Sequence, residues 1–288
     1  MKIAVASGKG GTGKTFVATN LFSVAQVLKK DAVLIDCDAE APNVHEFIQG
    51  EKMQTIEVQV KIPLVKQDEC SFCNLCFTHC NYQAIFYLPE RKMIHVTEEL
   101  CHACGVCSYV CPANAIIERD KKIGSIFQYQ YKDTFVYECK TEIGTASSVP
   151  VIKQGVKSVK NYPLVFLDSP PGISCPFIAT VESVDYVLLV AEPTPFGLHD
   201  LQLSIETLRE MEKPFGVLIN RANSFSKDMQ AYLNKEGIEI LLEIPFDKNI
   251  ASMYAEGKIL VEKDKKYQEI FISLMKNIEK DITSQWKK

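Results

Sequence analysis

The sequence of 288 residues lacks any long hydrophobic run. Its longest apolar stretches, such as residues 186–191, fall far short of the roughly 18 residues that a membrane-spanning helix needs. The apolar run that opens the chain is interrupted at Ser7, which is too early for a secretory signal peptide. These features predict a cytoplasmic protein without a membrane span.

An excess of charge of either sign is also missing. Thirty-two Lys and Arg residues are balanced by 36 Asp and Glu residues, which gives a net charge of −4 at pH 7. A protein that holds nucleic acid through a broad basic surface needs a large positive excess. We therefore expect no nucleic-acid partner. The content of 47% hydrophobic and 24% charged residues is ordinary for a globular protein and excludes a disordered or collagenous chain.

Short apolar runs rich in β-branched residues alternate with segments of helical spacing along most of the chain. The helical segments include residues 14–29, 197–211 and 226–235. This alternation predicts an α/β fold with a parallel sheet and helices on both faces. Six buried strands are expected, at residues 3–7, 32–36, 164–168, 186–191, 215–220 and 238–244.

Cysteine is abundant, and eight of the 11 cysteines lie between residues 70 and 111. Because a cytoplasmic chain keeps its thiols reduced, this clustering predicts metal binding rather than disulfides. The strand and helix alternation also breaks there. We expect a discontinuous α/β domain of residues 1–56 and 120–288, into which a metal-binding domain of residues 57–119 is inserted. A hairpin over residues 121–143 is expected to follow the insertion.

The cysteine block is an internal repeat, in which residues 70–85 align with residues 101–116. Each copy has the spacing C-x2-C-x2-C-x3-C of bacterial two-cluster ferredoxins, in which the fourth cysteine binds the other cluster. The spacing predicts a ferredoxin-like α+β domain with two 4Fe-4S clusters. The expected ligands are Cys70, Cys73, Cys76 and Cys111 for one cluster and Cys101, Cys104, Cys107 and Cys80 for the other.

Zinc is the competing metal, because paired C-x-x-C motifs also form zinc sites. The triple spacing and the Cys111-Pro112 pair favour iron and sulfur. Asn81 replaces the proline that usually follows the first run, which affects the local turn more than the ligation.

A glycine-rich motif lies between the first expected strand and the first expected helix. It fits G-x-x-x-x-G-K-[ST], in which glycines let backbone N–H groups surround phosphates. Lys14 would neutralise the outer phosphates of ATP, and the Thr15 hydroxyl would bind Mg²⁺. The predicted phosphate loop comprises Gly8, Lys9, Gly10, Gly11, Thr12, Gly13, Lys14 and Thr15.

The second lysine of this loop, Lys9, gives the motif a form that resembles the deviant Walker A loop of the MinD/ParA/nitrogenase-iron-protein class of ATPases. The resemblance implies a P-loop NTPase fold and a sandwich dimer, either of two identical chains or with a related ATPase. It also implies that Lys9 reaches the nucleotide of the partner. The alternative is a solvated surface lysine.

Two acidic segments resemble the switches of the same class. The first switch, residues 34–43, would place Asp36 near Mg²⁺, and Asp38 would orient or deprotonate the attacking water. The second switch, residues 167–172, would bind Mg²⁺ through water at Asp168 and sense the terminal phosphate at Gly172. Ligands bind at the carboxyl ends of such strands. Each aspartate alone could also be a turn or helix-capping residue.

Segments around Asn220 and Pro245 resemble those that hold the adenine in this class, although Asn220 alone could equally be a turn residue. Phe16 stands where the class commonly has Thr or Ser, and we expect it to pack the helix. Residues 266–288 carry the apolar stripe of an amphipathic helix. Its polar face mixes acidic and basic residues, which favours docking on the ATPase core over membrane binding.

Three cysteines lie outside the repeat. Cys175 stands at the offset from Asp168 at which a cysteine of the nitrogenase iron protein binds a cluster shared across the dimer. We favour the other interpretation of Cys175, a small buried apolar residue, because no second ligand is evident in the sequence. Cys139 is a conceivable companion ligand, and Cys37 is expected to be a packing residue.

Nearly the whole chain therefore resembles the MinD-superfamily ATPases that contain an inserted ferredoxin domain. The resemblance implies a dimerising, Mg-dependent ATPase that couples ATP binding and hydrolysis to iron–sulfur electron transfer, or to metal-cofactor assembly, on a partner protein. The alternative is a positioning or scaffold ATPase with structural or redox-sensing clusters. A third hypothesis, an electron carrier with vestigial ATP binding, is disfavoured by the complete set of Lys14, Thr15, Asp38 and Asp168.

Overall fold

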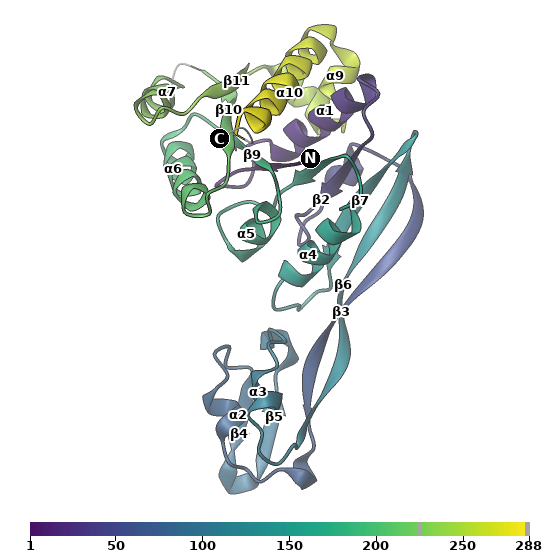
Figure 1. Cartoon of the computed structure of the whole chain (residues 1–288), viewed down its shortest axis with the longest axis vertical. Helices are drawn as coiled ribbons and strands as arrows, with labels where there is room; N and C mark the ends of the chain where they lie inside the picture. The colour runs from purple at the N-terminus through teal and green to yellow at the C-terminus, as the bar shows by residue number, and fades with distance from the viewer. Residues whose placement is uncertain (224–225, 286–288) are drawn as a thin grey trace.

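A computed structural model of the chain describes residues 1–223 and 226–285. Figure 1 shows a body of strands and helices from which a long two-stranded ribbon leads to a small lobe. We call the lobe, residues 66–115, the cysteine lobe, because it contains all eight cysteines of the repeat. We call the rest of the chain the body, except for the part of the ribbon that lies between the body and the lobe.

Within the described residues, the body is built on a nine-stranded sheet with the order β11-β10-β9-β1-β8-β2-β7-β6-β3. Its first six strands are parallel to one another and confirm the six expected strands. Their apolar side chains fill both faces of the sheet, as in a buried parallel sheet. They are β11 (Ile240–Pro245), β10 (Phe215–Ala222), β9 (Tyr186–Ala191), β1 (Lys2–Ala6), β8 (Leu164–Asp168) and β2 (Ala32–Asp36).

Helices cover both faces of this sheet, as the sequence predicts. Successive side chains of a strand point to opposite faces, so Ile3 and Val5 of β1 pack with one set of helices, and Ala4 and Ala6 pack with the other. The first set contains α1 (Lys14–Val27), α8 (Lys248–Ala255), α9 (Leu260–Lys263) and α10 (Lys265–Gln285). The second contains α4 (Val149–Ser158), α5 (Cys175–Val181), α6 (Pro195–Glu210) and α7 (Ser226–Lys235).

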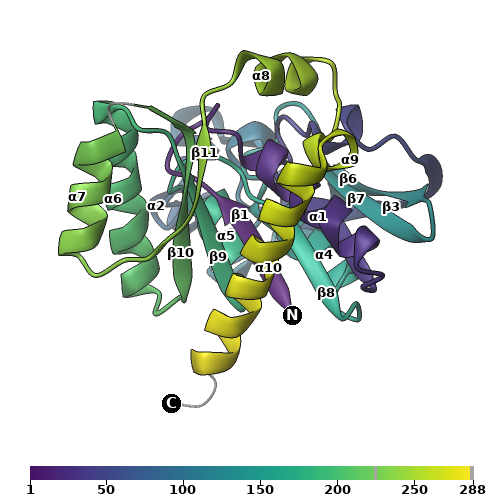
Figure 2. The same ribbon diagram turned by 90° about the horizontal axis from the view of Figure 1, so that it is seen from above.

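The C-terminal helix α10 docks on the body, as predicted. Figure 2 shows it crossing in front of the sheet beside α1. Its apolar stripe, which includes Phe271, Leu274 and Ile278, is buried in the same core as α1. The expected helix ran to residue 288, and residues 286–288 lie outside the described part of the chain.

The ribbon is formed by β3 (Glu51–Val65) and β6 (Ile116–Tyr131), which are antiparallel over nearly their whole length. The inner part of β6 also pairs with β7 (Thr134–Thr141), so this part belongs to the main sheet. The β6–β7 pair, with its turn at Lys132 and Asp133, confirms the expected hairpin over residues 121–143. The expected domain limits near residues 57 and 119 lie within β3 and β6, so both strands run from the body into the lobe.

The cysteine lobe repeats its backbone geometry together with its sequence. Helices α2 (Leu75–Thr78) and α3 (Val106–Tyr109) follow Asn74 and Gly105, which have positive φ angles of 71° and 75°. A hairpin of β4 (Ile85–Leu88) and β5 (Met93–Val96) lies between the two copies. The copies therefore fold alike, each with a short helix that carries the third cysteine of its set, Cys76 or Cys107. Short turns Gln67–Glu69 and Glu98–Leu100 precede the copies.

Candidate functional site

The phosphate loop connects β1 to α1 at the carboxyl edge of the parallel sheet. Gly11 and Gly13 have positive φ angles of 78° and 98°, a region that glycine adopts without strain. A Cβ atom on Gly13 would overlap the Asn220 side chain, so this position also requires glycine for space. Gly10 and Gly11 are exposed, whereas Thr12, Lys14 and Thr15 are buried. The loop thus presents its glycine backbone outward, at the N-terminus of α1, where anions bind.

Asn220 fastens this loop to the neighbouring strand β10. Its Nδ2 donates a hydrogen bond to the backbone oxygen of Thr12 at 2.8 Å, and its Oδ1 accepts one from the N–H of Arg221. On the other side, a Cβ atom on Gly8 would meet the backbone of Asp200 in α6. The N–H of Gly172, whose φ is +85°, donates to the Ser7 oxygen at 3.0 Å. The loop is therefore held between β10, α6 and the second switch.

Two aspartates meet beside the start of α1. Asp36 and Asp168 end β2 and β8 and are register partners in the sheet. The Thr15 hydroxyl donates to Oδ2 of Asp168 at 2.6 Å and lies 2.9 Å from Oδ1 of Asn43. The other carboxylate oxygen of Asp168, Oδ1, is buried without a hydrogen-bond partner. An unpaired carboxylate oxygen beside a hydroxyl and a second carboxylate is a donor set that suits a hard cation such as Mg²⁺.

Burial strongly perturbs both carboxyl groups. Desolvation raises the pKa of Asp168 to about 7, although the Thr15 hydrogen bond and the charge of Lys14 oppose the rise. Desolvation and the nearby charge of Asp168 raise the pKa of Asp36 well above its ordinary value. Each effect disfavours the ionised form. A bound cation would reverse this preference, because it would compensate both negative charges.

Asp36 has a second role that the sequence did not reveal. One of its carboxylate oxygens accepts hydrogen bonds from the backbone N–H groups of Asn43 and Val44 at 2.8 and 2.9 Å. The other accepts one from the N–H of Asp38 at 3.0 Å. Asp36 therefore anchors both ends of the loop that carries Asp38.

Asp38 and Lys9 take different positions around the loop. Asp38 is partly buried; desolvation raises its pKa, while the positive charge of Lys14 lowers it, so these two side chains lie within electrostatic range. Lys9 instead points to the end of β9, where its Nζ lies 3.5 Å from Oε2 of Glu192 and 3.4 Å from Oγ1 of Thr194. The structure thus brings Lys14, Asp38 and Asp168 together and leaves Lys9 apart from them.

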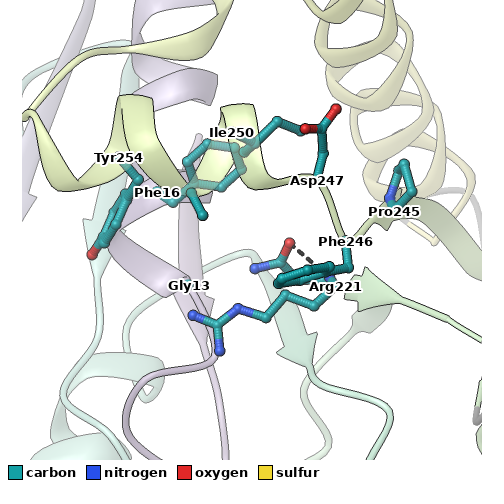
Figure 3. A pocket seen from close by; sticks show the side chains of 10 residues that line it. Gly13, Phe16, Arg221, Pro245, Phe246, Asp247, Ile250 and Tyr254 are labelled. Carbon is teal, nitrogen blue, oxygen red and sulfur yellow. Dashed lines mark hydrogen bonds between the residues drawn. The ribbon is translucent and has the colours of Figure 1, made fainter.

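A pocket of about 160 Å³ opens next to Gly13. Figure 3 shows that aromatic and apolar side chains from α1, α8 and the segment after β11 surround it. Asn220 and Pro245, which the sequence singled out, both line it. Phe16 lines it too and packs edge-on against Tyr254 and Phe271, so its expected packing role is confirmed. The pocket also includes residues that sequence motifs did not single out: Ile250, Ala251 and Tyr254.

The eight cysteines of the lobe line two separate cavities. Cys70, Cys73, Cys76 and Cys111 line one of them. Cys80, Cys101, Cys104 and Cys107 line the other. Each cavity thus combines three cysteines of one repeat with the last cysteine of the other. Across residues 1–223 and 226–285, no three His, Cys, Asp or Glu side chains are close enough together to hold a single metal ion.

The thiols within each set affect one another electrostatically. Burial raises the pKa of Cys76, and the negative charges of Cys70, Cys73 and Cys111 raise it further. Burial also raises the pKa of Cys101, with contributions from Cys104 and Cys80. Burial raises the pKa of Cys107 to about 11. Four thiolates in such a cavity repel one another, so their ionisation requires a compensating positive charge.

The remaining cysteines divide into a buried pair and an exposed single residue. Cys37 and Cys139 are fully buried in the core of the body and contact each other, so the packing role of Cys37 is confirmed. Cys175 is exposed at the start of α5, so the interpretation of Cys175 as a buried packing residue is wrong. Because Cys139 is enclosed in the core, it is not a companion ligand for Cys175.

Comparison with known proteins identifies the body. Residues 3–261 match the CobQ/CobB/MinD/ParA nucleotide binding domain. The chain belongs to this family. The fold is that of MinD, because the septum site-determining protein MinD of Pyrococcus horikoshii, solved with Mg-ADP, superposes with a TM-score of 0.62 at 18% identity, over 97% of this chain and 96% of that one. The body is therefore a P-loop nucleotide-binding domain.

Two sequence relatives from Methanocaldococcus jannaschii extend over both the body and the lobe region. An uncharacterized protein is 29% identical over 98% of this chain and 98% of its own length. An iron-sulfur cluster carrier protein is 22% identical over 96% of this chain and 83% of its own length. In the described residues of this family member, no helix combines the length and apolar character that spanning a bilayer requires.

Proposed function

We propose that this protein is a dimerising ATPase that couples ATP binding and hydrolysis to electron transfer from two resident 4Fe-4S clusters to a partner protein. The body supplies the nucleotide site and the cysteine lobe supplies the redox groups. The observation that carries the proposal is that each of two cavities is lined by four cysteines drawn from both repeats.

In the body, the phosphates of ATP would lie against the backbone of the phosphate loop, and the adenine would occupy the pocket between Phe16 and Tyr254. Mg²⁺ would be held by Thr15 and by the carboxylates of Asp168 and Asp36, and would supply charge neutralisation at the phosphates. Lys14 would neutralise the outer phosphates further. Asp38 would accept a hydrogen bond from the attacking water and orient it in line with the terminal phosphate.

In the lobe, the donor set fits 4Fe-4S clusters better than zinc. Four thiolates on one zinc ion converge tightly, whereas those on a cubane bind separate iron atoms and lie farther apart. The cysteines line cavities without converging on one point. When bound, each cluster would accept and release one electron.

The crossed ligand sets favour electron transfer over delivery of a cluster. A cluster that joins both repeats also holds the lobe together, so releasing it would cost the stability of the lobe. The similarity to an iron-sulfur cluster carrier keeps metal-cofactor assembly on a partner as the second candidate.

Iron counting in paired cysteine variants tests the resident clusters. The wild-type protein, reconstituted without oxygen, should contain about eight irons per chain. Cys76→Ala and Cys111→Ala affect the same cavity, so the double variant should retain about four irons. Cys76→Ala with Cys80→Ala affects both cavities and should retain almost none.

Almost no iron in Cys76→Ala with Cys111→Ala, and about four irons in Cys76→Ala with Cys80→Ala, would show that each repeat binds its own cluster. Stoichiometric zinc with no iron would contradict the redox proposal. A Cys175→Ala variant, outside the lobe, is the matched control and should keep about eight irons. Low-temperature electron paramagnetic resonance spectra of the reduced proteins should show one remaining cluster in the Cys76→Ala, Cys111→Ala variant and none in the Cys76→Ala, Cys80→Ala variant.

A further inference from the structure

We propose that the two halves of the cysteine lobe are not equivalent, and that the half around Cys101 is the one that senses the nucleotide. It docks on a segment of the body, residues 141–148, that is hydrogen-bonded to the first switch. We call this segment the relay. The inference rests on the proposed function, because it assigns nucleotide coupling to one of the two proposed cluster sites.

The relay contacts the lobe through residues 144–147, between its two ends. Cys101, His102 and Ala103 line a common cavity with residues 145–147 of the relay. A Cβ atom added to Gly144 would lie 3.7 Å from Cγ of Glu99, so backbone and side chain are adjacent there. The turn that carries Glu99 is itself held to the ribbon by an ion pair of 3.1 Å between Glu98 and Lys121. The loop around Cys101 is therefore packed between the ribbon and the relay.

The relay contacts the first switch at its two ends. Thr141 donates hydrogen bonds from its N–H and its hydroxyl to the backbone oxygen of Ala39, at 2.9 and 3.0 Å. The Ser148 hydroxyl donates to Oε1 of Glu40 at 3.2 Å. Ala39 and Glu40 directly follow Asp38 in the chain. Three hydrogen bonds therefore connect the first switch to the relay, so that a movement of the switch would displace the relay.

The internal repeat provides the comparison. Residues 70–74 are the counterpart of residues 101–105, and the cavity that they line is formed entirely by residues 65–116 of the ribbon end and lobe. Figure 1 shows the loop before α4, which contains the relay, at the end of the body that faces the lobe. The cavity that is shared with the body is lined by the Cys101 half, whereas the cavity around Cys70, Cys73 and Cys76 is lined by residues of the lobe and the ribbon end.

The contact between the relay and the Cys101 half can transmit a movement of the first switch only if the nucleotide favours one position of that switch over another. Ordering of a switch by the terminal phosphate is a common form of such a preference. Because linkage is reciprocal, a change in the Cys101 half would also alter nucleotide affinity. The Cys70 half would respond far less, since it lacks the shared cavity.

Hydrogen exchange on the full-length, iron-loaded protein tests this inference. Exchange is compared between the ADP state and the state with a non-hydrolysable ATP analogue. We expect the amides of residues 98–104 and of the relay to change protection with the nucleotide, and those of residues 67–73 to remain unchanged. Ser148→Ala should bind both nucleotides as the wild type does but lose the nucleotide-dependent difference at residues 98–104.

Ser158→Ala is the matched control, because Ser158 lies at the other end of α4 and its hydroxyl donates to the backbone oxygen of Gln154 within the helix. It should retain the wild-type response. An equal response in both halves, no response at residues 98–104, or an unchanged response in Ser148→Ala would overturn the inference. Iron content and ATP hydrolysis are measured on the same samples, so failure of the proposed function is recognised separately from the exchange pattern.

Discussion

The body and the cysteine lobe are stabilised in different ways. In the body, strands such as β1 and β8 are buried on both faces between layers of helices, so the apolar core is extensive. In the lobe, the hydrophobic core cluster consists of Cys76, Ile85 and Ile94, together with Ile116 at the start of β6. A unit of this size with so small a core is marginal unless a metal or another cross-link stabilises it. From this difference we expect the body to fold without a ligand, and the lobe to require a group bound to its cysteines.

Removal of metal should produce the largest difference in stability between the body and the lobe. Oxidation and chelation of the clusters should unfold residues 66–115 and leave the body folded, because bound structural metal contributes on the order of 10 kcal/mol to such small domains. Limited proteolysis with mass spectrometry should show first cleavage in the lobe. Nucleotide binding should persist within about twofold. A lobe that stays protected without iron would show that its small apolar core is sufficient.

The six parallel strands of the body could be predicted from the sequence, but only part of the ribbon was. The six parallel strands are continuous apolar runs, and the phosphate loop and cysteine repeat carry spacings that only a few structures require. Ile56, Val58, Val60 and Ile62 alternate with polar residues, a strand pattern that is not among the six expected strands, whereas residues 51–55 are exposed and carry no such alternation. That β3 pairs with the distant β6 leaves little local signal in either segment.

The candidate site also contains both residues that the sequence identified and contacts that it could not reveal. Lys14, Thr15 and Asp168 could be found because motif spacing specifies them. The backbone contacts of Asp36 could not, since they depend on how the chain folds back after Asn43. The contact of the relay with the Cys101 loop is likewise a tertiary contact between segments far apart in the sequence.

Substitutions at the nucleotide site should reduce ATP hydrolysis without removing the clusters of the lobe. Lys14→Ala should reduce ATP hydrolysis by at least about a hundredfold, because the phosphates lose a preorganised positive charge. Asp38→Ala should reduce hydrolysis by a similar factor of about a hundred while ATP still binds, since only the water loses its orienting partner. Steady-state ATPase assays and nucleotide titrations measure both. Both variants should keep the iron content of the wild type, and unchanged turnover in Asp38→Ala would remove Asp38 from the catalytic role.

Lys9 should act between two bodies rather than within one. In the single chain its ammonium group is paired with Glu192, away from Asp38 and Asp168. Lys9→Ala should therefore bind nucleotide with near wild-type affinity but fail to dimerise when ATP is added. Sedimentation velocity with ADP and with a non-hydrolysable analogue measures this. ATP-dependent dimers of the variant would contradict the role of Lys9 across the interface.

The stability of the body should depend on pH through the carboxyl group of Asp168. The pKa of Asp168 is raised from 3.8 to about 7, so the nucleotide-free folded protein binds more protons than the unfolded chain between these values. The free energy of unfolding of the body should therefore contain a contribution that decreases as pH rises from about 4 to about 7. Asp168→Asn should remove this contribution. Denaturant titrations of both proteins across this range give the difference, and parallel pH profiles would contradict the assigned pKa.

The most direct test of the connection between body and lobe is a redox titration of the iron-loaded protein in two nucleotide states. We expect the midpoint potential of one cluster to differ between the ADP state and the state with a non-hydrolysable ATP analogue by about 60 mV or more, which for one electron corresponds to a tenfold coupling. The same factor should separate the ATP affinities of oxidised and reduced protein. Titrations that superimpose in both states, together with equal ATP affinities, would contradict coupling and favour a scaffold ATPase with structural clusters.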